Sequence, residues 1–302
     1  MQNQDASLPT PRSWRCWLLA IRPKTLFAAI SPVLLGSALA YSEDKFHFLS
    51  AIAALLGAIC IQIGTNLAND YWDARKGTDT KERLGPVRVT AAGLLPAKQV
   101  LIATWLSFAV ASCFGCYLIW QAGWPVVVIG ILSIACGLLY TATRYSLAYL
   151  GLGDLFSFAF FGIVATAGTY FVQAKEFSYQ SCILGAIPGF YSVALLAVNN
   201  LRDRHGDELS NKRTLAVRFG DRFARGEVIV CLLLPGVIPW CGWDFPWMWT
   251  VGMSGIAVVF AKPIILAILR GCEGRSLNLY LGRTSLVNLF FSLLFAFFLI
   301  KK

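Results

Sequence analysis

Two groups of acidic and amide residues follow long apolar runs, and their spacing makes them the main candidates for chemistry. The members of the first group are three or four residues apart: Asn66, Asn69, Asp70 and Asp73. A helix that continues through them would place all four on one face. Gly77 then offers a stop for that helix, and Asp79 adds a carboxylate just beyond it. We call residues 66–79 the first acidic motif.

A similar group follows after four further apolar runs. Its acidic and amide members are Asn199, Asn200, Asp203 and Asp207. Three of them, Asn199, Asp203 and Asp207, are spaced by four residues, which again favours one face of a helix. We call residues 199–207 the second acidic motif. We expect the two motifs to face each other across one cavity, as corresponding parts of a pseudo-repeat of helical units.

Carboxylates beside Lys and Arg at the edge of a membrane helix suggest a magnesium–diphosphate site. Mg²⁺ prefers oxygen ligands and is commonly shared between a few carboxylates and substrate phosphates. The metal neutralises part of the charge on a leaving diphosphate, and neighbouring cations neutralise the rest. The candidate cations are Arg75, Lys76, Arg88, Arg144, Arg202 and Lys212. The alternative is a rim of internal ion pairs, although the repetition of the design after two separate runs argues against it.

The composition indicates a membrane protein. Of the 302 residues, 57% are hydrophobic and only 14% are charged, whereas a soluble domain is about a quarter charged. Nine apolar runs approach the roughly 20 residues needed to cross a bilayer. They are residues 24–41, 48–68, 99–120, 124–142, 152–173, 179–199, 226–244, 247–269 and 284–300. We therefore expect an all-α polytopic fold with nine transmembrane helices around a central cavity. It forms one domain, 14–302, after a disordered cytoplasmic tail, 1–13.

The net charge of +10 invites a nucleic-acid function, but its distribution argues for membrane topology instead. All but five of the 26 Lys and Arg residues lie in the N-terminal tail and the even-numbered connections. The exceptions are Lys45, Lys175, Lys262, Lys301 and Lys302. The positive-inside rule then places the N-terminus, the even connections and both acidic motifs in the cytoplasm. We expect a multi-pass protein of a bacterial inner or plasma membrane.

At these motifs the chain resembles the UbiA superfamily of intramembrane prenyltransferases. That superfamily's Asn-Asp-x-x-Asp…Asp motif is matched by Asn69, Asp70, Asp73 and Asp79, and its Asp-x-x-x-Asp motif by Asp203 and Asp207. The six-residue step from Asp73 to Asp79 is most similar to the menaquinone-pathway branch. One departure is Arg144, which stands four residues after Tyr140 where many members have Lys.

The resemblance implies substrates, a cofactor and residue roles. Mg²⁺ would be held by Asn69, Asp70, Asp73, Asp79, Asn200, Asp203 and Asp207, and catalysis would depend on Asp73, Asp207, Tyr140 and Arg88. A polyprenyl diphosphate would ionise to an allylic cation, which aromatic faces such as Tyr140 stabilise. Apolar cavity walls would exclude water. The implied acceptor is 1,4-dihydroxy-2-naphthoate, whose ring attacks at the carboxylate-bearing carbon and loses CO₂.

Other functions remain open from the sequence. A sister aromatic prenyltransferase would use 4-hydroxybenzoate or homogentisate as acceptor. A transporter of an anionic substrate would also need polar residues near membrane helices, but transporter sites usually lie near the midplane. A CDP-alcohol phosphotransferase would require Gly where Ala74 follows Asp73. Asp154, which opens the fifth run, is either a further site residue or a carboxylate favoured by the helix dipole.

Overall fold

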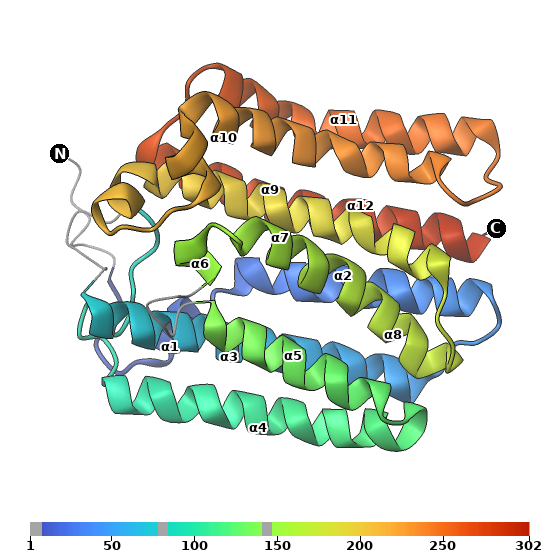
Figure 1. The fold of residues 1–302 in the computed structure, drawn as a ribbon, viewed down its shortest axis with the longest axis horizontal. Helices are drawn as coiled ribbons and strands as arrows, with labels where there is room; N and C mark the ends of the chain where they lie inside the picture. Colours follow the sequence, from blue (N-terminus) through green and yellow to red (C-terminus); the bar gives the residue numbers. More distant parts are fainter. Residues whose placement is uncertain (1–7, 78–83, 141–146, 302) are drawn as a thin grey trace.

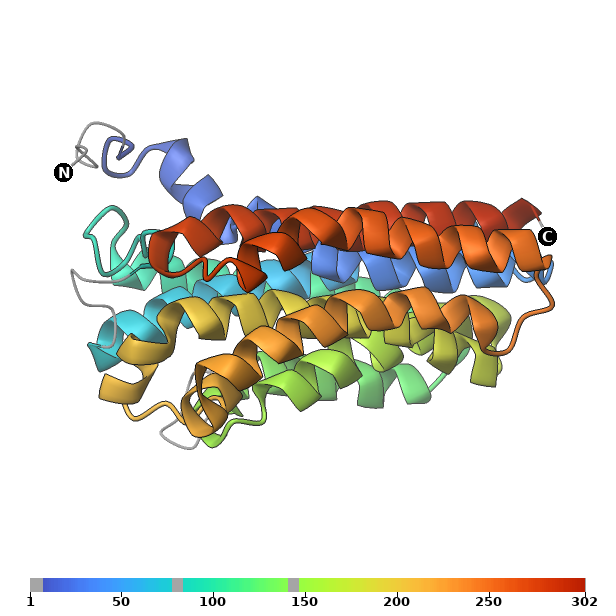
Figure 2. The same cartoon turned by 90° about the horizontal axis from the view of Figure 1, so that it is seen from above.

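The structure is a computed structural model that describes residues 8–77, 84–140 and 147–301. These residues form helices and short connections, with no strand among them. Figures 1 and 2 show the long helices lying side by side along the longest axis of the molecule. The prediction of an all-α membrane fold is confirmed. Asp79 and Arg144 lie outside the described residues.

Eight helical segments are long and apolar enough to cross a membrane. They are α2 (Pro23–Ser42), α3 (Phe48–Lys76), α4 (Ala97–Ala122), Gly153–Ala174, α9 (Tyr179–Leu209), Leu215–Trp240, α11 (Trp247–Leu269) and Gly274–Lys301. Helix α5 (Pro125–Leu139) is also apolar but shorter. The remaining short helices are α1 (Trp14–Ile21) and α6 (Leu147–Leu150). Each of the nine predicted apolar runs overlaps one of these apolar helices.

Three of the eight segments combine more than one kind of helix. Gly153–Ala174 consists of α7 (Gly153–Phe158), the π-helix η2 (Ala159–Val164) and α8 (Ala165–Ala174). Leu215–Trp240 consists of α10 (Leu215–Leu233) and the 3₁₀-helix η3 (Leu234–Trp240). Gly274–Lys301 consists of the short 3₁₀-helix η4 (Gly274–Ser276) and α12 (Leu277–Lys301). The irregular turns mark places where the regular helical hydrogen bonds are interrupted.

The seventh apolar helix begins earlier than its hydropathy indicated. The prediction started at residue 226, whereas α10 starts at Leu215 and is kinked at Gly220, whose φ is 83°. Hydropathy missed these turns because they carry charged side chains. Arg225 is held there by Asp221 at 2.6 Å and by Glu273 at 2.9 Å. The Asp221–Arg225 pair lies within α10, and the Arg225–Glu273 pair ties α10 to the α11–α12 connection.

Helix α9 packs closely against the π-helix η2. A side-chain carbon added at Gly162 would lie 2.6 Å from the carbonyl oxygen of Gly185 and from the Cα of Gly189. Only glycines allow such an approach of two backbones, a common device between membrane helices. This contact fixes α7, which opens with Gly153 and Asp154, against the helix that carries the second acidic motif.

Helix α2 packs against α3, α8, α9 and α12, so the first and last long helices meet. The Ser285 hydroxyl of α12 donates a hydrogen bond to the Lys24 carbonyl of α2. The α3–α4, α9–α10 and α11–α12 connections lie at the same end of the bundle as α1 (Figure 1). We call this the motif end, because both acidic motifs lie there.

Candidate active site

Helix α3 continues without a break through the first acidic motif to Lys76. Gly77 then adopts the left-handed conformation with a φ of 67°, and its N–H points to the carbonyls of Ala74 and Asp73. This is a common helix stop. The motif side chains on α3 are all buried, namely Asn66, Asn69, Asp70 and Asp73. The prediction that the helix runs through the motif is confirmed.

Two residues of the first acidic motif bind neighbouring backbone. The Asn66 amide donates to the Ile21 carbonyl at 2.8 Å, which fixes the α1–α2 junction to α3. The two carboxylate oxygens of Asp70 accept the N–H groups of Val89 and Thr90 at 3.1 and 2.9 Å. Asp70 therefore anchors the α3–α4 loop through both of its carboxylate oxygens.

The anchored loop brings Arg88 to Asp73. Their side chains form an ion pair with a nitrogen–oxygen distance of 2.6 Å, and they are only 7% and 3% exposed. Buried, charge-assisted hydrogen bonds of this kind are short and strong. The structure thus joins two of the residues that the sequence resemblance marked as catalytic. Asp70 sets the position of Arg88, because it accepts a hydrogen bond from the N–H of the next residue, Val89.

In the second acidic motif, Arg202 organises its neighbours. Its guanidinium donates to Asp203 at 2.8 and 2.5 Å, to Asn199 at 2.6 Å and to Asn278 of α12 at 2.7 Å. Asn278 in turn donates to the Leu84 carbonyl at 2.8 Å. All three guanidinium nitrogens are therefore occupied within the protein. Arg202 links the motif to α12 and to the α3–α4 loop, and its diphosphate contact stays a prediction.

One aromatic ring connects the two motifs. The ammonium group of Lys76, at the end of α3, lies 5.1 Å from the centroid of the Tyr149 ring. The ammonium group of Lys212, which follows α9, lies 5.7 Å from the same centroid. Lys212 is also 3.7 Å from an Asp207 carboxylate oxygen. The cations at the ends of both motifs thus gather at one place.

A second tyrosine lies among the carboxylates. Tyr140 follows α5, and the carboxylates of Asp154, Asp207 and Asp73 all act electrostatically on its phenol. A Cβ atom added at Gly153 would lie 3.5 Å from the Tyr140 hydroxyl oxygen. Tyr140 therefore lies within range of carboxylates from α3, α7 and α9 at the motif end.

Other predicted residues have different surroundings. Arg75 is exposed and donates to the Tyr71 hydroxyl at 3.1 Å, on a different face of α3 from Asp73. Asn200 is buried, 6% exposed, on α9. Within the described ranges, no group of three or more His, Cys, Asp or Glu residues could hold a metal. The donors that the motifs supply are carboxylate and amide oxygens, which suit Mg²⁺ chemically.

Sequence reasoning missed Tyr149 and Glu227. Tyr149 lies on a short helix with no distinctive spacing. Glu227 of α10 is within electrostatic range of Asp154, and each has one buried carboxylate oxygen without a hydrogen-bond partner among the described residues. Buried carboxylates in a membrane protein are rare and usually functional. Glu227 could have been found from the sequence, because it is an acidic residue at the start of the apolar run 226–244.

Apolar helices that enclose carboxylates, amides and cations at one end are typical of an enzyme embedded in a membrane. The chain belongs to the UbiA prenyltransferase family, which matches its residues 29–276, including both helix-borne motifs. The chain is therefore a prenyltransferase, as the motifs predicted.

Named relatives cover most of the chain. It is 32% identical over 294 residues to the 1,4-dihydroxy-2-naphthoate octaprenyltransferase of Haemophilus influenzae, covering 93% of this chain and 94% of that protein. It is 36% identical over 238 residues to the 1,4-dihydroxy-2-naphthoate octaprenyltransferase of Mycobacterium tuberculosis, covering 76% and 81%. The first alignment covers nearly the whole chain, and the second covers about three quarters of it.

Solved structures share the fold. A UbiA homolog from Archaeoglobus fulgidus, bound to DMAPP and Mg²⁺, superimposes with a TM-score of 0.66 at 12% identity, covering 94% of this chain and 99% of that chain. A digeranylgeranylglyceryl phosphate synthase superimposes with a TM-score of 0.59 at 14% identity, covering 95% and 99%. At such low identity the likeness establishes the arrangement of helices alone.

Proposed function

We propose that this enzyme transfers a polyprenyl group from polyprenyl diphosphate to 1,4-dihydroxy-2-naphthoate, releasing diphosphate and CO₂ and giving demethylmenaquinol. The observation that carries the proposal is the shared placement of Lys76 and Lys212 at Tyr149, beside the carboxylates of both acidic motifs. That arrangement suits a diphosphate. The proposed acceptor is the one in the names of the relatives. Their sequences match most of the chain.

Mg²⁺ fits the oxygen donors of both motifs. We assign it to Asn69 and Asp73 on α3 and to Asp203 and Asp207 on α9, and Asp79 keeps its predicted role as a ligand. When bound, the metal neutralises charge on the diphosphate and makes it a better leaving group. Asp70 acts through the loop that it anchors.

The cations around the site bind the diphosphate oxygens. Lys76 and Lys212 approach from the two motifs, and Arg88 lies beside Asp73. Because each is held next to a carboxylate or a ring, its position is set before substrate arrives. Such preorganised charges stabilise a leaving anion without reorganising during the reaction.

The apolar bundle protects the prenyl cation from water. As the bond between C1 of the prenyl group and the diphosphate oxygen breaks, Tyr140 offers a π face to the allylic cation. The ring carbon that carries the carboxylate then forms the new bond to C1. Its carboxylate leaves as CO₂ and returns an electron pair to the ring. The polyprenyl tail extends sideways into lipid, since it does not cross water.

We also propose a side of the membrane. The excess of Lys and Arg at the motif end supports a site on the cytoplasmic face of a bacterial inner or plasma membrane. A water-soluble aromatic acid reaches it from the cytoplasm, while the prenyl donor reaches it from the bilayer.

One incubation tests the proposal. Membranes that contain the protein are mixed with a polyprenyl diphosphate, Mg²⁺ and 1,4-dihydroxy-2-naphthoate, and products are identified by mass. We expect the prenylated, decarboxylated naphthoquinol, and none from membranes without the protein. Product from 4-hydroxybenzoate or homogentisate instead would move the enzyme to a sister branch and refute the acceptor assignment.

A further inference from the structure

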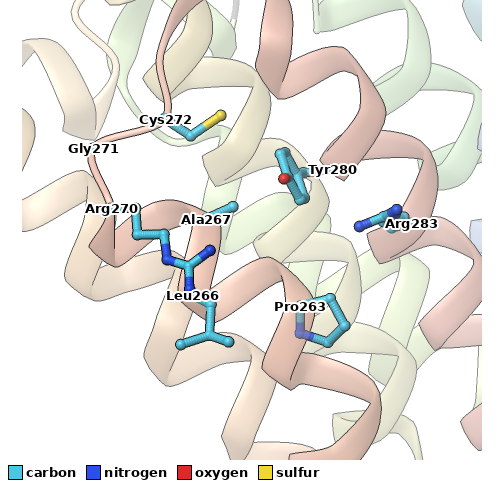
Figure 3. A pocket seen from close by; sticks show the side chains of 8 residues that line it. All are labelled: Pro263, Leu266, Ala267, Arg270, Gly271, Cys272, Tyr280 and Arg283. Carbon is cyan, nitrogen blue, oxygen red and sulfur yellow. The ribbon is translucent and has the colours of Figure 1, made fainter.

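A second charged site lies apart from the acidic motifs, where α11 ends and α12 begins. Here the structure contains a pocket of about 410 Å³, a size that accommodates a small ligand or headgroup. Its walls include Pro263, Leu266, Arg270, Cys272, Tyr280 and Arg283 (Figure 3). We call it the α11–α12 pocket. None of these residues has a part in the prenyl transfer described above.

Two positively charged side chains border this pocket. Figure 3 shows Arg270 from the end of α11 and Arg283 from α12, with Tyr280 between them. The Arg283 guanidinium carbon lies 5.4 Å from the centroid of the Tyr280 ring. Across the described ranges of the chain, neither arginine forms an ion pair with a carboxylate. Paired guanidinium groups of this kind suit the oxygens of a phosphate.

The wall of the pocket is held in place from α10. Arg225 donates to the carbonyls of Ile268 and Cys272 at 2.8 and 3.3 Å, and to the Glu273 carboxylate at 2.9 Å. These bonds span the turn that carries Arg270. The turn is therefore fixed by an arginine that does have partners, while Arg270 itself remains available to a ligand.

The pocket lies where a spanning helix leaves the apolar region. Helix α11 ends at Leu269, which is 67% exposed, and Leu266, which lines the pocket, is 38% exposed. The α11–α12 connection is at the motif end, which the charge distribution assigns to the cytoplasm (Figure 1). Basic pockets between membrane helices on that side are typical binding places for anionic lipid headgroups.

We propose that the α11–α12 pocket binds the phosphate of an anionic phospholipid. Arg270 and Arg283 contact the phosphate oxygens, and the acyl chains lie along the exposed leucines of α11. A free phosphate would use the charges alone. The apolar side chains of Pro263 and Leu266 favour the lipid, because they can contact its acyl chains, which a free phosphate lacks.

Lipid titration of the purified full-length protein in detergent tests this site. Short-chain phosphatidylglycerol is added, with phosphatidylcholine of the same chain length and inorganic phosphate as separate arms, and Kd is read from the shift in thermal unfolding. Wild type should bind phosphatidylglycerol and respond to neither of the others. Arg270→Gln/Arg283→Gln should bind it about tenfold more weakly, and Arg270→Gln alone about threefold more weakly.

The matched control is Arg222→Gln/Arg275→Gln, which removes the same charge from exposed arginines outside the pocket. It should keep the wild-type Kd. Equal binding by the pocket and control variants would place the lipid elsewhere and overturn the proposal. An equal shift with inorganic phosphate would assign the pocket to a soluble anion and overturn it as well. Unfolding temperatures without lipid establish that each variant is folded.

Discussion

Lys76 and Lys212 share one aromatic partner, with their ammonium groups 5.1 and 5.7 Å from the centroid of the Tyr149 ring. One lysine ends the helix of the first acidic motif, and the other follows the helix of the second. Two like charges brought together repel each other, so a bound anion stabilises the pair. This relationship supports a diphosphate position between the motifs.

We expect Tyr149→Leu to raise the KM for polyprenyl diphosphate by about fivefold, because two cation–π contacts of about 0.5–1 kcal/mol each are lost. The kcat should change less, since the ring holds the lysines and does not contact the reacting carbon. Steady-state kinetics in membranes measure both constants. Tyr149→Phe keeps the ring and should behave as wild type; a similar loss in both variants would refute the role of the ring.

Asp73→Ala or Asp207→Ala should abolish Mg²⁺-dependent prenyl transfer while the protein still inserts into the membrane. The reason is that each removes a proposed metal oxygen donor, one from each motif. Product formation over a Mg²⁺ titration measures the effect. Asp244→Ala, an exposed carboxylate outside both motifs, is the control. Normal turnover by either motif variant in purified form would contradict the metal assignment.

Arg88→Ala should reduce both activity and stability. It leaves the buried Asp73 carboxylate without its 2.6 Å partner, and breaking a buried pair destabilises a protein by about 3–5 kcal/mol. Thermal unfolding and turnover of the same preparation show the two effects. Arg222→Ala, which removes an exposed arginine, should change neither. An Arg88→Ala protein with wild-type stability would mean that the pair contributes nothing to the fold.

Asp70→Ala should release the α3–α4 loop, because the N–H groups of Val89 and Thr90 lose their acceptor. Arg88, which is 7% exposed in the folded protein, then becomes accessible to trypsin. Mass analysis of a limited digest detects cleavage after Arg88. Asp73→Asn keeps the Asp70 anchor and should stay resistant at that bond. Equal cleavage of both variants would show that Asp70 does not hold the loop.

The end of the bundle opposite the motifs has an ion-pair cluster that makes stability depend on pH. Lys45 lies 2.6 Å from Glu176 and 2.9 Å from Glu43, and the Tyr170 hydroxyl donates to Glu43 at 2.5 Å. The hydrogen bond from Lys45 lowers the pKa of Glu176 below its ordinary 4.5. Hydrogen bonds to Glu176 and Glu43 raise the pKa of Lys45 above its ordinary 10.5.

These two shifts define the pH window of the cluster. The Glu176 contribution is fully present above pH 4.5 and is lost as pH falls through the lowered pKa. The Lys45 contribution is present below pH 10.5 and is lost only as pH rises through the raised pKa. Lys45→Met should therefore unfold at a lower temperature than wild type at pH 7, and the difference should shrink below pH 4.5. Lys301→Met is the control, and a pH-independent difference for Lys45→Met would refute the assignment.

The sequence alone determined the helical membrane fold and the helix of the first acidic motif. Apolar runs of about 20 residues leave the backbone no partners in lipid except its own, so they become helices. The spacing of Asn66, Asn69, Asp70 and Asp73, with Gly77 after them, fixed one continuous helix and its end. The family followed from the same residues, because its motifs are local in sequence.

Only the tertiary structure decided what each polar residue binds. Asn66, Asp70 and Asp73 share a face by helical spacing, yet they bind the α1–α2 junction, the loop at Val89 and Arg88 respectively. Helical periodicity sets the direction of a side chain but not the segment that packs opposite it. The shared contact of Lys76 and Lys212 with Tyr149 joins three segments far apart in the chain, so no local pattern contains it.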